Sequence, residues 1–117
     1  MAKKGLDPVD ARLRRLYGIT LAEYNRICTL SDGGCWICGS KPKTRRLHTD
    51  HKHAKGYKKL TPAEKRLHVR GVLCAWCNAG LRKFRDQPQF FDRAAEYLRT
   101  YPAQKVLSGI DEPEQGR

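Results

Sequence analysis

Histidines are concentrated in one short stretch of this chain. Three of the four lie within six residues, at His48, His51 and His53, around Asp50. An imidazole exchanges a proton near neutral pH, and a carboxylate binds hard divalent cations, so the combination suits a metal and proton-transfer site. The same residues on a solvated basic surface would carry no chemistry, and the rest of the sequence has to decide between these interpretations.

Two Cys-x-x-Cys pairs flank the histidines: Cys35 with Cys38, and Cys74 with Cys77. One turn brings two thiolates to an ion and two turns complete a tetrahedron, so the spacing predicts a closed structural Zn²⁺ site. The 35 residues between the pairs exceed the separation in a simple zinc ribbon, and they contain all four histidines. The alternatives are a thiol redox motif, which the second pair disfavours, and two disulfides, which an intracellular setting disfavours.

Asp50, His51 and Asn78 are the residues that this zinc frame would bring together. Asp50 and His51 end a candidate strand, and Asn78 directly follows the last zinc ligand. Carboxylate and amide oxygens suit Mg²⁺ or Mn²⁺, and a neighbouring imidazole can deprotonate water. Taken singly, each residue is more typical of a turn, a solvated face or a helix cap. At these positions relative to both cysteine pairs, the three residues together supply the metal ligands and the base that hydrolysis of a phosphodiester requires.

The order of these motifs resembles the phage recombination endonuclease VII family, which belongs to the HNH or His-Me finger nucleases. The resemblance rests on Cys-x-x-Cys, Asp-His-x-His, VRGVLC and Cys-x-x-Cys-Asn, and with LYGITLAEYNRI and FFDRAAEYLRTY it covers roughly residues 12–101. It implies an α+β fold: a small ββα-metal core with a structural four-cysteine zinc site and flanking helices. It also implies metal-assisted hydrolysis that leaves 5′-phosphate and 3′-hydroxyl ends.

The resemblance further assigns roles to single residues. Asp50 and Asn78 match the family's ligands for the catalytic Mg²⁺ or Mn²⁺, and His51 matches its general base. His53 would contact phosphate or support the metal site, and His48 matches a further histidine whose role is less defined. The four cysteines match the family's zinc ligands.

Two segments depart from the family pattern. Residues 52–70, here called the basic segment, are long where many relatives have a short hairpin turn, and we expect them to alter DNA contacts or specificity. The C-terminal region is short beside that of relatives that resolve DNA branches and pair as intertwined dimers. The sequence therefore leaves open whether this chain forms a homodimer.

The charge of the chain points to a polyanionic partner. It has 24 Lys and Arg against 12 Asp and Glu, a formal net charge of +12. Eleven of the basic residues lie between Lys41 and Arg70, with only two acidic residues among them. This positive field, centred on the histidines, favours DNA as the partner. The residues that we expect to bind nucleic acid are Arg70, the strongest candidate, with Lys52, Lys55, Arg45 and Arg46.

Local signals place the secondary structure around this core. Capping residues, first-turn prolines and periodicity predict helices over residues 7–18, 20–30, 75–84 and 86–101, and strands over residues 46–51 and 69–74. We divide the chain into an N-terminal helical region (1–32), a zinc-stabilised nuclease core (33–85), a C-terminal helix (86–101) and a tail expected to be flexible (102–117). We expect Cys28 to be a buried hydrophobe, and Trp36 and Trp76 to pack around the zinc.

The sequence as a whole predicts a metal-dependent DNA endonuclease that nicks or cuts duplex or branched DNA. No apolar run approaches eighteen residues and the first residues lack a signal-peptide core, so we expect no membrane partner and a cytoplasmic protein. The resemblance implies a phage or prophage protein that acts in its bacterial host. The alternative is a zinc-stabilised DNA-binding module without catalysis. That module would need the basic surface and the zinc, but not Asp50, His51 and Asn78 together.

Overall fold

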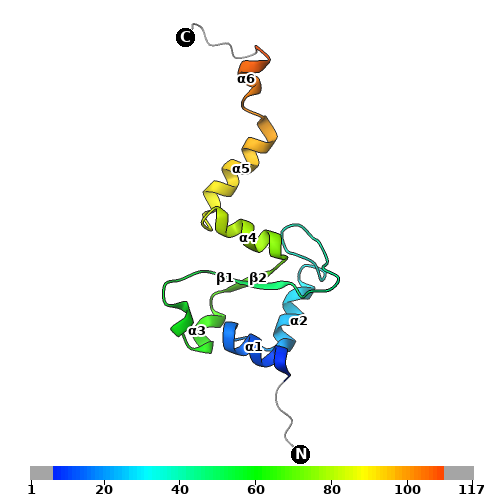
Figure 1. Ribbon diagram of the computed structural model, residues 1–117, viewed down its shortest axis with the longest axis vertical. Helices are drawn as coiled ribbons and strands as arrows, with labels where there is room; N and C mark the ends of the chain where they lie inside the picture. Colours follow the sequence, from blue (N-terminus) through cyan, green and yellow to red (C-terminus); the bar gives the residue numbers. More distant parts are fainter. Residues whose placement is uncertain (1–6, 110–117) are drawn as a thin grey trace, which may run out of the picture. The chain divides into compact units, whose positions relative to one another are not determined.

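A computed structural model describes residues 7–109 of the chain (Figure 1). The elements are α1 (Pro8–Tyr17), α2 (Leu21–Thr29), β1 (His48–His51), the 3-10 turn η1 (Tyr57–Lys59), α3 (Pro62–Arg66), β2 (Val69–Leu73), α4 (Ala75–Lys83), α5 (Pro88–Thr100) and α6 (Gln104–Leu107). Helices thus accompany one small sheet, so the predicted α+β class is confirmed. The chain divides into two compact units, the first ending at Gly80 and the second beginning at Leu81. The finer four-part division stays a prediction.

Both N-terminal helices begin and end at the residues that the sequence indicates. The Asp7 carboxylate accepts hydrogen bonds from the backbone N–H groups of the first turn of α1, at 2.7 and 3.4 Å. Gly18 ends α1 in the left-handed region with φ 72°, which glycine adopts without strain. Thr20 and Glu23 form the predicted capping box of α2, with bonds of 3.0 and 2.9 Å.

A buried carboxylate joins the first two helices. Asp10 is only 9% exposed; it accepts hydrogen bonds from the backbone N–H of Leu21 at 2.7 Å and from Nε of Arg14 at 2.6 Å. These bonds, first the one from Leu21, lower the pKa of Asp10. Because the Leu21 N–H is one of the unpaired donors at the start of α2, Asp10 fixes the angle between α1 and α2.

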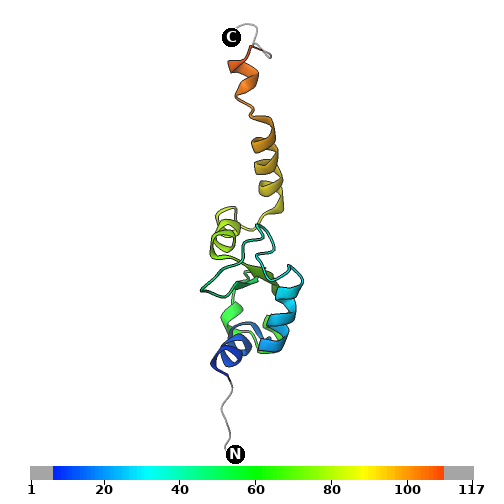
Figure 2. The same ribbon diagram turned by 90° about the vertical axis from the view of Figure 1, so that its right-hand side faces the viewer.

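The sheet consists of two antiparallel strands, β1 and β2. Asp50 pairs with Gly71 and His51 pairs with Val69, so the register shifts by one residue between them. Such a bulge bends the strand and changes the direction of the side chain that follows. The helices α1, α2 and α3 lie along one side of the two strands, as both views show (Figures 1 and 2).

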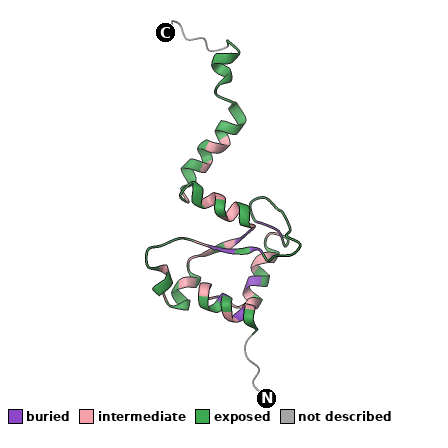
Figure 3. Cartoon of the chain, viewed as in Figure 1, coloured by how far each residue is buried: buried purple, intermediate pink, exposed green. Residues whose placement is uncertain are grey.

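The buried residues of the described chain lie in the first unit, on its helices, its strands and the loop between them (Figure 3). The Tyr24 hydroxyl joins two of these elements, because it donates a 2.8 Å hydrogen bond to the Leu47 carbonyl just before β1. Burial raises the pKa of Tyr24 beyond its ordinary range, so this phenol stays protonated and keeps its donor. The buried hydrophobic residues are Leu13, Ile19, Tyr24, Cys35, Leu47, Val72 and Leu73.

The second unit is built on α5, which begins with Pro88 in its first turn as predicted. Phe84 and Phe91 meet edge to face with ring centroids 5.0 Å apart, but no described residue of this unit is buried. The short helix α6 lies inside the segment predicted as a tail, and residues 110–117 are outside the described range. Across residues 7–109, no helix is both long and apolar enough to cross a lipid bilayer.

Candidate metal centre and nuclease site

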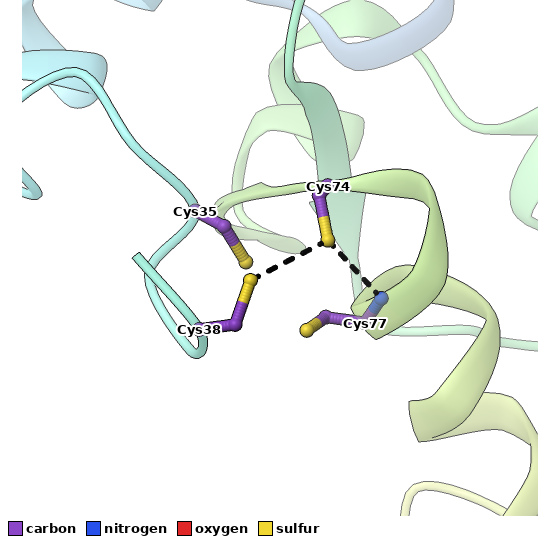
Figure 4. Close-up of side chains that lie close together, drawn as sticks. All are labelled: Cys35, Cys38, Cys74 and Cys77. Atoms are coloured by element: carbon purple, nitrogen blue, oxygen red, sulfur yellow. Dashed lines mark hydrogen bonds between the residues drawn. The ribbon is translucent and has the colours of Figure 1, made fainter. Parts of the chain in front are cut away.

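The four cysteines of the two Cys-x-x-Cys pairs form one cluster. Cys35 and Cys38 come from the loop after α2, while Cys74 follows β2 and Cys77 lies in the first turn of α4; their sulfurs point toward one another (Figure 4). The four Sγ atoms lie within 4.8 Å of one another, and those of Cys38 and Cys74 are 3.8 Å apart. A tetrahedral zinc ion with Zn–S bonds of about 2.3 Å separates its sulfurs by about 3.8 Å. The cluster therefore fits structural zinc.

The thiols of this cluster differ in how readily they ionise. Burial disfavours the Cys35 thiolate, but hydrogen bonds from backbone N–H groups outweigh burial and lower its pKa to about 6. Burial and the neighbouring thiols raise the pKa of Cys77 to about 12. Four thiolates this close repel one another, so only a cation can hold all four ionised. All five cysteines of the chain are free thiols.

The tryptophans between the ligands do not pack around the cluster as predicted. Trp36 is 61% exposed and Trp76 is 85% exposed. The Trp36 backbone N–H donates to the Val72 carbonyl at 3.1 Å, so its turn is tied to β2 while the indole stays outside. The reason is geometric, since two ligands of one ion point inward and the residues between them point outward. Cys28, predicted to be buried, is only half-buried and lies outside the cluster.

Asp50 is a buried carboxylate bound by a guanidinium. Its side chain is 5% exposed, and the residue lies on β1 at the register shift, where Arg70 is the extra residue on β2. Arg70, on β2, donates from Nε to Oδ2 at 2.8 Å and from Nη2 to Oδ1 at 3.1 Å. Such a fork compensates the cost of burying the charge. Each carboxylate oxygen still has a second lone pair, so Asp50 fits a divalent cation, although Arg70 already holds the same group.

Asn78 lies in the first turn of α4, directly after Cys77 of the four-cysteine cluster. Its backbone N–H donates to the Cys74 carbonyl at 2.9 Å, and its side chain is half-buried. The helix begins at Ala75, so Asn78 is not its N-cap, which was the alternative role for this residue. Its amide oxygen is a suitable ligand for Mg²⁺, and its pairing with Asp50 on one ion stays a prediction.

His51 is enclosed by aromatic rings. The Tyr57 ring stacks on it with centroids 4.2 Å apart and planes at 24°, and the rings of His53 and Tyr17 are 4.8 and 5.7 Å away. Burial lowers the pKa of His51, and the neighbouring His53 lowers it further, while Asp50 acts in the opposite direction. His51 is therefore neutral at pH 7 and carries a lone pair that can accept a proton.

The other histidines have different surroundings. His53 is exposed, and its ring stands next to that of His51. His48 is exposed at the start of β1, opposite Leu73. His68 is half-buried, with Nδ1 3.1 Å from the Glu64 carbonyl and its ring edge-on to that of Tyr57 at a centroid distance of 5.8 Å, and its exclusion from the site stays a prediction. The structure thus brings His51 and His53 together beside Asp50.

Tyr57 is the neighbour of His51 that the sequence analysis missed. It stands in a run of lysines without clear periodicity, so neither spacing nor motif marked it. The predicted nucleic-acid residues Lys52, Lys55, Arg45 and Arg46 are all exposed, as a DNA-binding surface requires, while the Arg70 guanidinium lies on Asp50. Contact of any of these side chains with phosphate stays a prediction.

Comparison with known proteins decides the family. A family model described as recombination endonuclease VII matches residues 10–100. The chain belongs to this family. Two curated relatives are the Gene 59 proteins of Mycobacterium phage L5, 39% identical over 100 residues, and of Mycobacterium phage D29, 36% identical over 100 residues. Each alignment covers 84% of this chain and 54% of the relative, so the chain spans about half the length of the curated relatives it matches. No solved structure matches the chain.

Proposed function

We propose that this chain is a metal-dependent DNA endonuclease with the ββα-metal arrangement of the His-Me finger nucleases. The observation that carries the proposal is the position of buried Asp50 next to His51, whose pKa is lowered, at the register shift between β1 and β2, in a chain of the endonuclease VII family. DNA as the substrate is supported by the net charge of +12 and by the exposed basic residues around this site.

In this proposal Asp50 and Asn78 hold one Mg²⁺ or Mn²⁺. When bound, that ion polarises the scissile phosphate and stabilises the leaving 3′ oxygen. His51 accepts the proton of the attacking water at an imidazole nitrogen, and His53 contacts the phosphate. The Arg70 guanidinium, in a side chain 36% exposed, neutralises Asp50 before the metal ion and DNA arrive. The products carry 5′-phosphate and 3′-hydroxyl ends.

The zinc cluster has a positioning role in the same proposal. An ion held by four thiolates has no open coordination position, so it does not act on substrate. It joins the loop that carries Cys35 and Cys38 to the junction of β2 and α4, and so fixes the turn of α4 that carries Asn78. The relatives are phage proteins, which supports action in the cytoplasm of a phage-infected bacterium.

The test is cleavage of supercoiled plasmid and of a synthetic four-way junction with Mg²⁺ or Mn²⁺, comparing the wild type with His51→Ala. Loss of a general base lowers the rate by roughly 10²–10⁴-fold. We expect the wild type to cut and the variant to lose that factor while keeping its zinc content and circular dichroism spectrum. The ratio of junction to plasmid cleavage then gives the substrate class. Equal rates in the two proteins would remove His51 from the mechanism.

One observation favours a second candidate, a zinc-stabilised DNA-binding module without catalysis. Arg70 already satisfies both oxygens of Asp50, so the carboxylate needs no metal ion for its stability. Titration with Mn²⁺, followed by electron paramagnetic resonance on zinc-loaded protein, separates the two candidates. If the chain is an endonuclease, it should bind one Mn²⁺ and lose that ion in Asp50→Asn. If it is a binding module, it should bind DNA but no Mn²⁺ at this site.

A further inference from the structure

The basic segment is docked against the end of α1. The last carbonyls of a helix have no partner within the helix, and they favour hydrogen-bond donors and positive charge. Three side chains of the segment donate to backbone carbonyls at this end. They are Lys65 Nζ to Arg15 at 3.0 Å, the Tyr57 hydroxyl to Leu16 at 2.6 Å, and Arg66 Nη1 to Gly18 at 2.9 Å. Two of its cations therefore bind the protein itself.

The contact between α3 and the first two helices is close and specific. Arg66 also forms a fork with Glu23 of α2, with Nη1–Oε1 and Nη2–Oε2 distances of 2.9 and 2.8 Å. At Gly18 an added Cβ would lie 2.0 Å from the Pro62 carbonyl oxygen, so the chain fits there only without a side chain. A capping box of Thr61 with Glu64 fixes the start of α3. These contacts hold Tyr57 and α3 against α1 and α2.

Tyr57 connects α1 to His51. One end of its side chain is held by the 2.6 Å bond to α1, and the face of its ring covers the face of the imidazole at 4.2 Å. The Lys65 ammonium lies 5.6 Å from the centroid of the Tyr57 ring. Stacking uses the face of the imidazole, while the lone pair that accepts a proton lies in the ring plane. Tyr57 therefore limits the orientation of His51 without covering its nitrogens.

We propose that Tyr57 is the positioning residue for His51, and that the basic segment serves to hold Tyr57 in place. This inference rests on the proposed function, in which His51 is the general base. A base must be aligned with the water that it deprotonates, and misplacement by about 1 Å costs up to 10²-fold in rate. In this chain, the segment expected to alter DNA contacts thus forms one wall of the catalytic site.

The test compares Tyr57→Leu and Tyr57→Phe with the wild type, and uses Tyr97→Leu as a matched control. Tyr97 is 64% exposed on α5 and belongs to the second unit. The first readout is the NMR signal of the His51 ring protons in zinc-loaded protein labelled at histidine. A stacked tyrosine moves these protons to lower chemical shift. We expect that shift in full in the wild type and in Tyr97→Leu, in part in Tyr57→Phe, which keeps the ring but lacks the hydroxyl that binds Leu16, and a large reduction in Tyr57→Leu.

The second readout is single-turnover DNA cleavage at saturating enzyme. We expect Tyr57→Leu to lower the cleavage rate constant about 10- to 100-fold with DNA affinity unchanged within about twofold. Tyr57→Phe should fall between Tyr57→Leu and the wild type, because it keeps the stacked ring and loses the bond to Leu16. A role in DNA binding alone would instead weaken affinity and leave the rate constant intact. That outcome, or an unchanged His51 shift in Tyr57→Leu, would overturn the inference. If the wild type cuts no DNA, the proposed function fails, and the NMR comparison still decides whether Tyr57 orients His51.

Discussion

Replacing Arg70 with alanine tests the buried ion pair directly. The Asp50 side chain is 5% exposed, so without Arg70 its carboxyl group loses both hydrogen bonds and its counter-charge where little water reaches it. Removal of one partner of a buried pair costs about 3–5 kcal/mol. The Arg70 side chain is 36% exposed, so water can enter the space that it leaves. We therefore expect Arg70→Ala to lower the free energy of unfolding by about 2–3 kcal/mol, below that range.

Removing the carboxylate should cost less stability than removing the guanidinium, because only the guanidinium reaches water. Asp50→Asn leaves Arg70 charged, but the guanidinium reaches water, so we expect a loss of about 1 kcal/mol. The variant with both Asp50→Asn and Arg70→Ala carries no unpaired buried charge. We expect it to be more stable than Arg70→Ala alone by about 1 kcal/mol or more. Arg70→Lys keeps the charge and loses the two-point geometry, so its stability should fall between wild type and Arg70→Ala.

The assay is urea denaturation of zinc-loaded protein followed by circular dichroism, with thermal melts in parallel. For a domain of this size, 2–3 kcal/mol corresponds to roughly 10–20 °C in Tm. Added Mn²⁺ should restore part of the stability of Arg70→Ala, because the ion replaces the lost counter-charge on Asp50. A loss under about 0.5 kcal/mol would refute the reasoning, because it would mean that Asp50 is hydrated in solution.

Three further predictions concern the scaffold. Cys77→Ser should lose zinc and the cooperative unfolding transition, because the free energy of zinc binding, about 10–16 kcal/mol for structural sites, is also free energy of folding. Metal analysis and thermal melting check this prediction. The control Cys28→Ser should keep its zinc. Glu23→Gln should lower stability near pH 6 relative to wild type. The Arg-bound carboxylate has its pKa lowered to about 2 from 4.5, so the difference should shrink as pH falls below about 4.5, which denaturation midpoints at several pH values measure. Gly18→Ala should destabilise the protein by more than the roughly 1 kcal/mol that a left-handed backbone costs, because its Cβ would also clash with the α3 backbone. Gly33→Ala is the control, since its backbone is also left-handed but the space around it is open. Urea denaturation should show the smaller loss of stability in Gly33→Ala.

Several features were predictable because they depend on neighbours in the chain. Asp7, Gly18 and the box of Thr20 with Glu23 act within one or two turns, so residue type and spacing suffice to place the helix ends. The zinc cluster was predictable for a similar reason. Each pair bends one turn around an ion, and thiolate chemistry requires that two such turns meet.

Other features depend on pairs that no local rule connects. The ion pair of Arg70 with Asp50 was not predicted, because it depends on the antiparallel pairing of β1 with β2, and a phosphate contact of Arg70 stays a prediction. Trp36 was expected to pack around the zinc and is exposed, because it stands between two inward-pointing ligands. These outcomes depend on strand register and on side-chain direction, which composition and spacing do not encode.

The family, the four-cysteine cluster and the short motif that contains Asp50 and His51 were predictable from the sequence, because each depends on residue type at a fixed spacing. The surroundings of His51 were not. The docking of the basic segment on α1 brings Tyr57 to the imidazole, although 41 residues separate this tyrosine from the Leu16 carbonyl that anchors it. A contact over that separation follows from the packing of α3 against α1 and α2, and it forms only when the chain has folded.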